Sequence, residues 1–190
     1  MSEQKKDQTF LEVKDLKVEY FSDGQTVHAV NGVSLKIERG KTLGLVGETG
    51  AGKTTIAKSI LRILPDVGAK VSEGKVYLDG QELFALPEQE MRKIRGNGIS
   101  MIFQDPMTAL NPVQTVGDQI AEVVRLHNTG SKESFEKRAR EMLEMVGIPG
   151  DRYHEYPHQF SGGMKQRVVI AIALACNPGL LLADEPTTAL

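Results

Sequence analysis

The sequence predicts an α/β fold that begins with an antiparallel β-subdomain and carries a helical insertion before its last strand. Two patterns lead to this prediction. Apolar and polar residues alternate near the N-terminus, as they do in half-buried strands, and farther along the chain short apolar runs are separated by stretches with helical spacing. The chain has 190 residues, enough for one domain with a substantial core.

The first part of the chain favours strands around one short helix. We expect a turn at Ser22-Asp23-Gly24 and a helix over Ile56–Leu64, because the proline at position 65 cannot continue a helix. An Asp-Gly pair at positions 79 and 80 predicts a second tight turn. Four segments are expected to be strands, the third of them buried and parallel: Phe10–Tyr20, Val27–Ile37, Thr42–Val46 and Lys75–Leu78.

The second part of the chain alternates strands with helices. Ile99–Phe103 and Leu180–Ala183 are apolar runs typical of central strands. Thr115–Gly147 has helical spacing in two segments separated by Asn128-Thr129-Gly130, and a further helix begins at Ser161. We expect Leu180–Ala183 to pair with Ile99–Phe103 and not with Thr42–Val46.

Composition excludes several classes of function. Lys and Arg total 23 and Asp and Glu total 25, so the net charge of −2 argues against a general affinity for nucleic acid. A single cysteine, Cys176, allows no intrachain disulfide and suits a reducing cytoplasm. The longest uncharged apolar run, Val168–Cys176, is far shorter than the roughly 20 residues that span a bilayer. We therefore expect a soluble chain that reaches a membrane only through a partner.

A glycine-rich stretch lies between a predicted strand and a predicted helix. Residues 47–54 match the phosphate-binding pattern G-x-x-x-x-G-K-[ST] without departure. Glycines let backbone N–H groups point at a phosphate, and the helix N-terminus adds partial positive charge. We expect Lys53 to reach the β- and γ-phosphates of ATP and the Thr54 hydroxyl to bind Mg²⁺. The expected nucleotide contacts are Gly47, Glu48, Thr49, Gly50, Ala51, Gly52, Lys53, Thr54 and Thr55.

Two acids end the last predicted strand. Asp184 is placed to bind Mg²⁺, directly or through water, and Glu185 is placed to polarise the water that attacks the γ-phosphate. Acids often begin surface turns, so this pair predicts catalysis only in combination with the phosphate-binding loop.

Two further features complete an ordered set. Gln104 follows the strand Ile99–Phe103, and Phe160-Ser161-Gly162-Gly163-Met164 precedes the acid pair. Alone, Ser-Gly-Gly would be an ordinary helix cap. In this order, the set resembles the ATPases of ABC transporters, whose signature is usually LSGGQ; here Phe replaces the Leu and Met replaces the Gln. The resemblance covers the chain from Phe10 to Leu190.

The resemblance implies roles for several residues and a partner. Tyr20 would stack on adenine, with Phe21 as the weaker candidate, and Gln104 would contact Mg²⁺ and the attacking water as a catalytic group beside Glu185 and Lys53. Ser161, Gly162 and Gly163 would hold the γ-phosphate of ATP bound to a second ATPase subunit, as a homodimer or heterodimer. The subunits would work on transmembrane permeases at the cytoplasmic face of the membrane, with no nucleic acid partner.

The resemblance also implies a domain organisation and a subfamily. An ATP-binding core would occupy residues 10–104 and 161–190, and a helical subdomain residues 105–160. Phe103–Pro112 and Tyr156–Met164 resemble the oligopeptide, dipeptide and nickel importer ATPases. The alternatives are an ABC ATPase outside transport, or a nucleotide-binding module without turnover. We expect the domain to be incomplete after Leu190, its last strands missing, and the 190-residue chain alone to lack steady ATPase activity.

Overall fold

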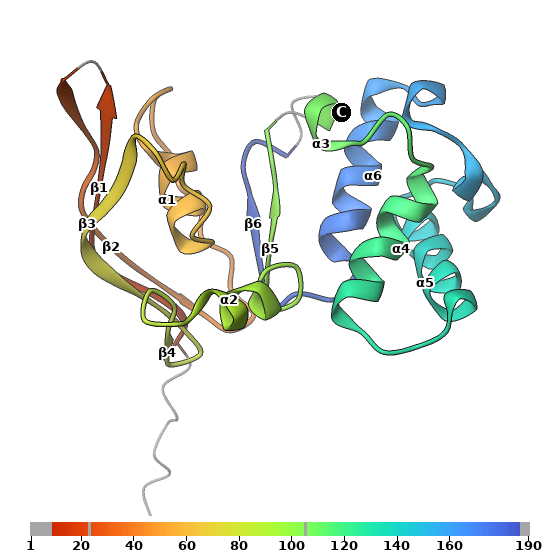
Figure 1. The fold of residues 1–190 in the computed structure, drawn as a ribbon, viewed down its shortest axis with the longest axis horizontal. Helices are drawn as coiled ribbons and strands as arrows, with labels where there is room; N and C mark the ends of the chain where they lie inside the picture. Colours follow the sequence, from red (N-terminus) through yellow and green to blue (C-terminus); the bar gives the residue numbers. More distant parts are fainter. Residues whose placement is uncertain (1–8, 23, 105, 187–190) are drawn as a thin grey trace, which may run out of the picture. The chain divides into compact units, whose positions relative to one another are not determined.

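The computed structural model describes residues 9–22, 24–104 and 106–186. The chain divides after Met91 into two compact units, the first ending at that residue and the second beginning at Arg92. Figure 1 shows the elements of both units coloured along the sequence.

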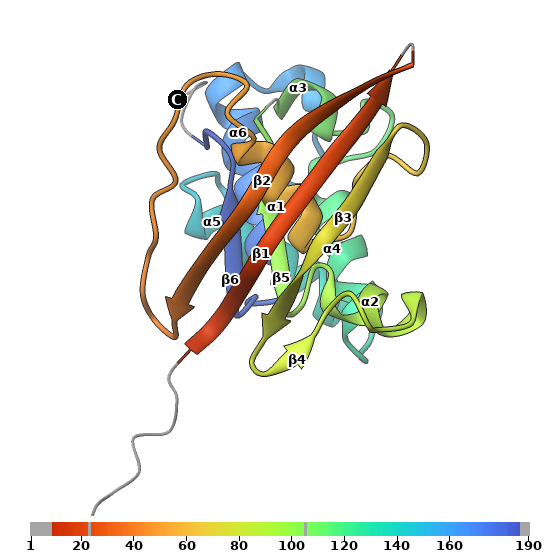
Figure 2. The ribbon, with the colours of Figure 1, turned by 90° about the vertical axis from the view of Figure 1, so that its left-hand side faces the viewer.

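The first unit contains the predicted antiparallel sheet, which has four strands, the last of them not predicted. The strands are β1 (Thr9–Ser22), β2 (Gln25–Glu38), β3 (Ala69–Leu78) and β4 (Gln81–Glu82). Their order across the sheet is β2-β1-β3-β4, which Figure 2 shows face on. The sheet buries alternate apolar residues of β1, among them Leu11, Val13, Leu16 and Val18.

The predicted turns and the predicted helix of this unit are largely confirmed. Leu78 pairs with Gln81 across a two-residue turn in which Asp79 and Gly80 have φ angles of 49° and 82°. In the other turn Ser22 pairs with Gln25, while Asp23 lies outside the described residues. Helix α1 (Lys53–Ile60) begins three residues before the predicted range and ends four before its predicted end.

The predicted strand Thr42–Val46 is wrong. Residues 41–48 have no regular secondary structure, and Leu43, Leu45 and Val46 are 44%, 46% and 99% exposed. An apolar run becomes a strand only where a neighbouring strand offers backbone hydrogen bonds, and the sheet of the first unit contains no ladder to this segment. One helix, α2 (Glu88–Ile94), was not predicted.

The second unit contains a parallel strand pair and a set of helices. Strands β5 (Ile99–Ile102) and β6 (Leu180–Ala183) pair in parallel, which confirms the predicted partner of the last strand. The helical elements are α3 (Pro106–Ala109), α4 (Val116–His127), α5 (Lys132–Met145), the short 3₁₀ segments η1 (Gly150–His154) and η2 (Pro157–Gln159), and α6 (Gly162–Leu174).

The three long helices of this unit each begin at a side-chain cap and share one core. The hydroxyls of Thr115, Ser131 and Ser161 accept a backbone N–H three residues on. Helices α4, α5 and α6 pack against one another (Figure 1) and bury an apolar cluster. Its central members are fully buried: Val116, Ile120, Ala139, Leu143, Val168 and Ala171. Within the described residues of the whole chain, none of the helices is both long and apolar enough to cross a membrane.

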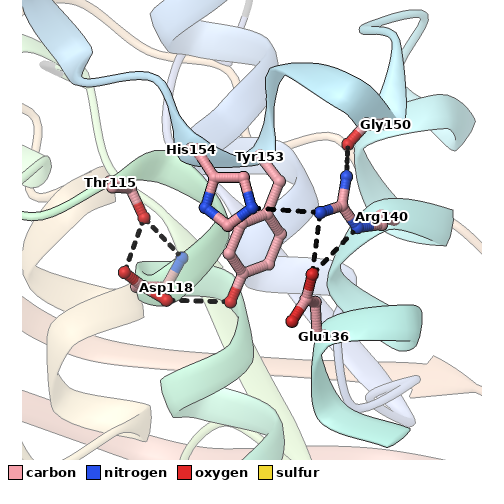
Figure 3. Close-up of polar contacts among 7 residues, drawn as sticks. All are labelled: Thr115, Asp118, Glu136, Arg140, Gly150, Tyr153 and His154. Atoms are coloured by element: carbon pink, nitrogen blue, oxygen red, sulfur yellow. Dashed lines mark hydrogen bonds and ion pairs between the residues drawn. The ribbon is translucent and has the colours of Figure 1, made fainter. Parts of the chain in front are cut away.

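Tyr153 ties the segment η1 to helix α4 (Figure 3). Its hydroxyl donates to Asp118 Oδ1 at 2.9 Å, and the other oxygen of Asp118 accepts from the hydroxyl of Thr115 at 2.7 Å. Burial first, and then the bond to Asp118, raise the pKa of Tyr153 above its ordinary value, so the phenol stays protonated and remains a donor.

Arg140 ties the same segment to helix α5 (Figure 3). Its guanidinium bonds Glu136 on its own helix, donates to the carbonyl of Gly150, and lies 3.3 Å from His154 Nε2. It also lies over the Tyr153 ring, 4.8 Å from the ring centre. The segment η1 is therefore held by two neighbouring helices.

A substitution at Gly117 tests the packing of Tyr153 against helix α4. A Cβ atom at this position would lie 2.1 Å from the Tyr153 ring. Alanine normally favours a helix over glycine by about 1 kcal/mol. Here we expect Gly117→Ala to lower the free energy of unfolding by about 1–3 kcal/mol, because the ring must move. Urea unfolding followed by circular dichroism measures this. Gly162→Ala, at the start of α6 with open space around the added atom, is the matched control and should not destabilise.

Candidate functional site

The phosphate-binding loop of the first unit wraps around the ammonium group of Lys53. Lys53 Nζ donates to the carbonyls of Gly47 and Glu48 at 2.7 and 2.9 Å. Gly52 has a φ of 83°, and a Cβ there would lie 2.3 Å from the carbonyl oxygen of Ala29. Glycine is therefore required at this position for its left-handed backbone and for the close approach of β2.

The N-terminus of α1 has the electrostatics of an anion site. Its N-cap, Gly52, supplies no side-chain acceptor, and the first turn contains no acidic residue. The first backbone N–H groups of a helix lack intrahelical partners and carry partial positive charge. Lys53 adds a full positive charge at the same end of the helix, so the loop and the helix together favour a phosphate.

Tyr20 lies beside the same helix. Its hydroxyl is 3.5 Å from Thr55 Oγ1, and the side chain is half-buried. The neighbouring Phe21 is 45% exposed. Tyr20 therefore lies near the phosphate-binding loop, and its contact with adenine stays a prediction.

The acid pair of the second unit follows directly from the strand pairing. Asp184 N–H donates to the carbonyl of Ile102 at 3.0 Å, which continues the ladder of β5 and β6 past the last strand residue. Glu185 then adopts a left-handed backbone with a φ of 50°. Gln104 Nε2 donates to Glu185 Oε2 at 2.8 Å. Two residues 81 positions apart in the sequence are therefore in direct contact, and their predicted catalytic roles stay predictions.

The oxygen donors of the chain fit Mg²⁺. The described residues contain no group of three or more His, Cys, Asp or Glu side chains that could hold a metal. Mg²⁺ does not need such a cage, because it is usually bound by one or two protein oxygens, substrate phosphates and waters. The Asp184 carboxylate and the Thr54 hydroxyl are hard oxygen ligands of the required kind.

The signature segment opens helix α6. Ser161 is the N-cap, and its Oγ accepts from Met164 N–H at 3.3 Å. Ser161 and Gly162 are exposed, whereas Phe160 is buried in the core of the second unit. The sequence left open a simple capping turn here, and the capping geometry is present. The predicted contact with ATP on a second subunit stays a prediction.

One polar residue near the acid pair was missed by sequence reasoning. Gln166, on α6, is fully buried, and its Nε2 donates to the carbonyl of Pro186 at 2.6 Å. A glutamine in a helix whose next residues are mostly apolar, Val168, Val169 and Ile170, is the signal that could have identified it.

Comparisons with known proteins identify the family of the chain. A family model described as ABC transporter matches residues 30–188. The chain is 52% identical to the dipeptide transport ATP-binding protein DppD and 50% identical to the oligopeptide transport ATP-binding protein OppD, both of Bacillus subtilis. Each match covers 95% of the chain, but the chain spans only about half of these relatives, 54% and 51% of their lengths.

A solved structure gives the same result for the fold. The ATP-binding cassette MJ0796, in a dimeric post-hydrolysis state bound to ADP and Pi, is 34% identical to the chain and matches it with a TM-score of 0.84. That match covers 95% of the chain and 75% of the cassette. Because the family model matches most of the sequence and the fold agrees, this chain belongs to the ABC transporter family.

Proposed function

We propose that the chain is the ATP-binding and ATP-hydrolysing part of a subunit that energises an ABC importer for peptides or a related small solute. The contact between Gln104 and Glu185 carries the hydrolytic part of this proposal, because it places an amide and a carboxylate together at the ends of paired strands. The importer part is supported by relatives whose names are those of dipeptide and oligopeptide transport proteins.

The phosphate loop would bind the nucleotide. Lys53 would exchange its two carbonyl contacts for phosphate oxygens, with which a charged hydrogen bond is stronger. The N–H groups at the start of α1 would add to this attraction. Tyr20 would stack on the adenine ring. Residues 47–55 thus supply affinity for ATP, and Lys53 would also stabilise the charge that develops on the γ-phosphate.

Glu185 would act as the general base. Its carboxylate would orient a water and accept a proton from it as the water attacks the γ-phosphate. Gln104 would hold that carboxylate and the water through its amide. Bound Mg²⁺, held by Thr54 and Asp184, would neutralise charge that develops on the phosphate oxygens.

A second ATPase subunit would be the direct partner. Ser161, Gly162 and Gly163 present a hydroxyl and backbone N–H groups at the start of α6, which suits the γ-phosphate of ATP held by another subunit. The cassette of similar fold is itself dimeric. The helical subdomain, residues 105–160, would dock a permease at the cytoplasmic side of the membrane.

Lys53→Ala should weaken MgATP binding at least about tenfold, because it removes a charged hydrogen bond worth about 1.5–3 kcal/mol. Equilibrium titration with a fluorescent ATP analogue measures the change in Kd. Lys58→Ala, on the same helix and away from the loop, is the control and should bind normally. Equal affinities of both variants would refute the assignment of the loop.

Glu185→Gln in the full-length protein should lower ATP turnover by about a hundredfold or more and leave ATP binding within a few-fold of normal. The amide keeps an oxygen that can accept from Gln104, yet it is a far poorer base. Phosphate release and nucleotide titration measure the two effects. Glu141→Gln, at an exposed position on α5, should retain full turnover. Normal hydrolysis by the Glu185 variant would exclude this residue as the base.

Crosslinking from single introduced cysteines tests whether the proposed helical subdomain contacts a permease. In a Cys176→Ser background, Val113→Cys places a thiol in the proposed helical subdomain, where the native valine is 79% exposed. Val27→Cys places one on β2, where the native valine is 57% exposed. We expect crosslinks from position 113 to reach a membrane subunit and those from position 27 not to do so. The reverse pattern would place the docking surface on the β-subdomain.

A further inference from the structure

Gln166 is an unusual residue for the interior of a helix. Its side chain is completely buried, and the other buried residues of α6 are Val168, Val169, Ala171 and Ala173. The amide nitrogen has one close partner, the carbonyl of Pro186. The amide oxygen is also buried and has no hydrogen-bond partner among the described residues. Half of this buried amide is therefore unsatisfied.

An unsatisfied acceptor in a core lowers stability, because the oxygen has lost water without gaining a donor. Methionine has nearly the same length and fills irregular core space without a polar atom. Packing alone would therefore favour methionine or leucine over glutamine at this position. The amide is therefore better explained by its contact with the carbonyl of Pro186 than by packing.

The contacted carbonyl belongs to the residue that directly follows Glu185. Glu185 has a left-handed backbone, which residues with a side chain rarely adopt, so its surroundings must maintain it. Pro186 has no N–H group, so a donor side chain must hold this turn through a carbonyl, and the carbonyl that Gln166 contacts is that of Pro186. Gln166 holds this carbonyl at 2.6 Å, and Gln104 holds the Glu185 carboxylate at 2.8 Å.

We infer that Gln166 is a positioning residue for Glu185. Its amide fixes the carbonyl of Pro186, one residue beyond Glu185, and so keeps the left-handed turn and sets the direction of the carboxylate toward the attacking water. It acts through Glu185 and does not itself touch the nucleotide. The inference rests on the proposed role of Glu185 as general base.

The same contact connects two functional segments of the second unit. Gln166 lies five residues after Ser161, the N-cap of α6. A displacement of α6 that breaks the bond to Pro186 would release the turn that carries Glu185. The position of the signature helix is thus linked to the geometry of the base.

Gln166→Met in the full-length protein separates positioning from packing. The variant loses the donor and also loses the unsatisfied acceptor. We expect its Tm to stay close to that of the unaltered protein, because removal of the buried acceptor offsets the lost bond to the Pro186 carbonyl. We expect its KM for ATP to stay within about twofold and its kcat to fall at least about tenfold, as a misdirected catalytic group requires. An unchanged kcat would overturn the inference. A fall in Tm together with a proportionate loss of active protein would also overturn it, because that result shows a packing role only.

Gln119→Met is the matched control. Gln119 is also a buried helical glutamine, but both ends of its amide are satisfied, by Asn111 N–H and by the carbonyls of Asn111 and Gln114. Its replacement strands those backbone groups, so Tm should fall while kcat per folded molecule is kept. The opposite responses of two buried glutamines would support a specific role for Gln166.

A double variant links the effect to the base. In a Glu185→Gln background, Gln166→Met should lower the residual turnover by less than twofold, because the base that it positions is already absent. A full tenfold further loss would overturn the inference. If Glu185→Gln alone keeps normal turnover, the base assignment itself fails and the inference falls with it. If Glu185→Gln is inactive and Gln166→Met is normal, only the inference fails.

Discussion

The four residue pairs between β5 and β6 set Ile99 opposite Leu180 and Ile102 opposite Ala183, and the Asp184 N–H continues the same ladder to Ile102. The residues that follow both strands must then emerge side by side. Side chains alternate along a strand, so a slip of one residue would displace Glu185 by about 3.3 Å and reverse its face. The contact between Gln104 and Glu185 therefore depends on backbone register, to which the side chains of the site contribute little.

Helix α6 shows how one residue can serve structure and function together. Ser161 uses the acceptor side of its hydroxyl to cap the helix at Met164 N–H. A hydroxyl has a donor as well as two acceptor lone pairs, so the cap leaves its proton able to point outward. The capping interpretation and the phosphate interpretation of the Ser-Gly-Gly segment are therefore compatible. A cap is in fact a condition for the proposed anion site, since it fixes the direction of the first N–H groups.

The sequence allowed prediction where local chemistry decides the structure. The alternation in β1 and β2 and the helical spacing of α4 and α5 act over a few residues, and each of these elements was placed correctly within a few positions. Thr42–Val46 was mispredicted because a strand also needs a partner, which no apolar run can specify.

Long-range contacts explain the remaining omissions in the candidate site. Gln166 was missed because its role comes from a carbonyl 20 residues away, and a helical pattern gives no sign of such a contact. The ordered motifs predicted separate roles for Gln104 and Glu185 at the attacking water, but their direct contact and its dependence on the strand register came only from the structure.

The free-energy cost of the left-handed backbone at Glu185 explains why side chains from two other elements hold this residue. A left-handed backbone costs a residue with a side chain about 1–2 kcal/mol. A hydrogen bond contributes about 0.5–1.5 kcal/mol when neutral and about 1.5–3 kcal/mol when one partner is charged. The bonds from Gln166 to Pro186 and from Gln104 to the carboxylate are therefore of the size needed to offset the strain. The contact of Gln104 with the carboxylate is exposed, whereas the Gln166 side chain is fully buried, so water can replace the Gln104 contact more readily. Loss of that contact would leave the Glu185 turn held from the side of α6, so the carboxylate could change direction while the backbone stayed in place.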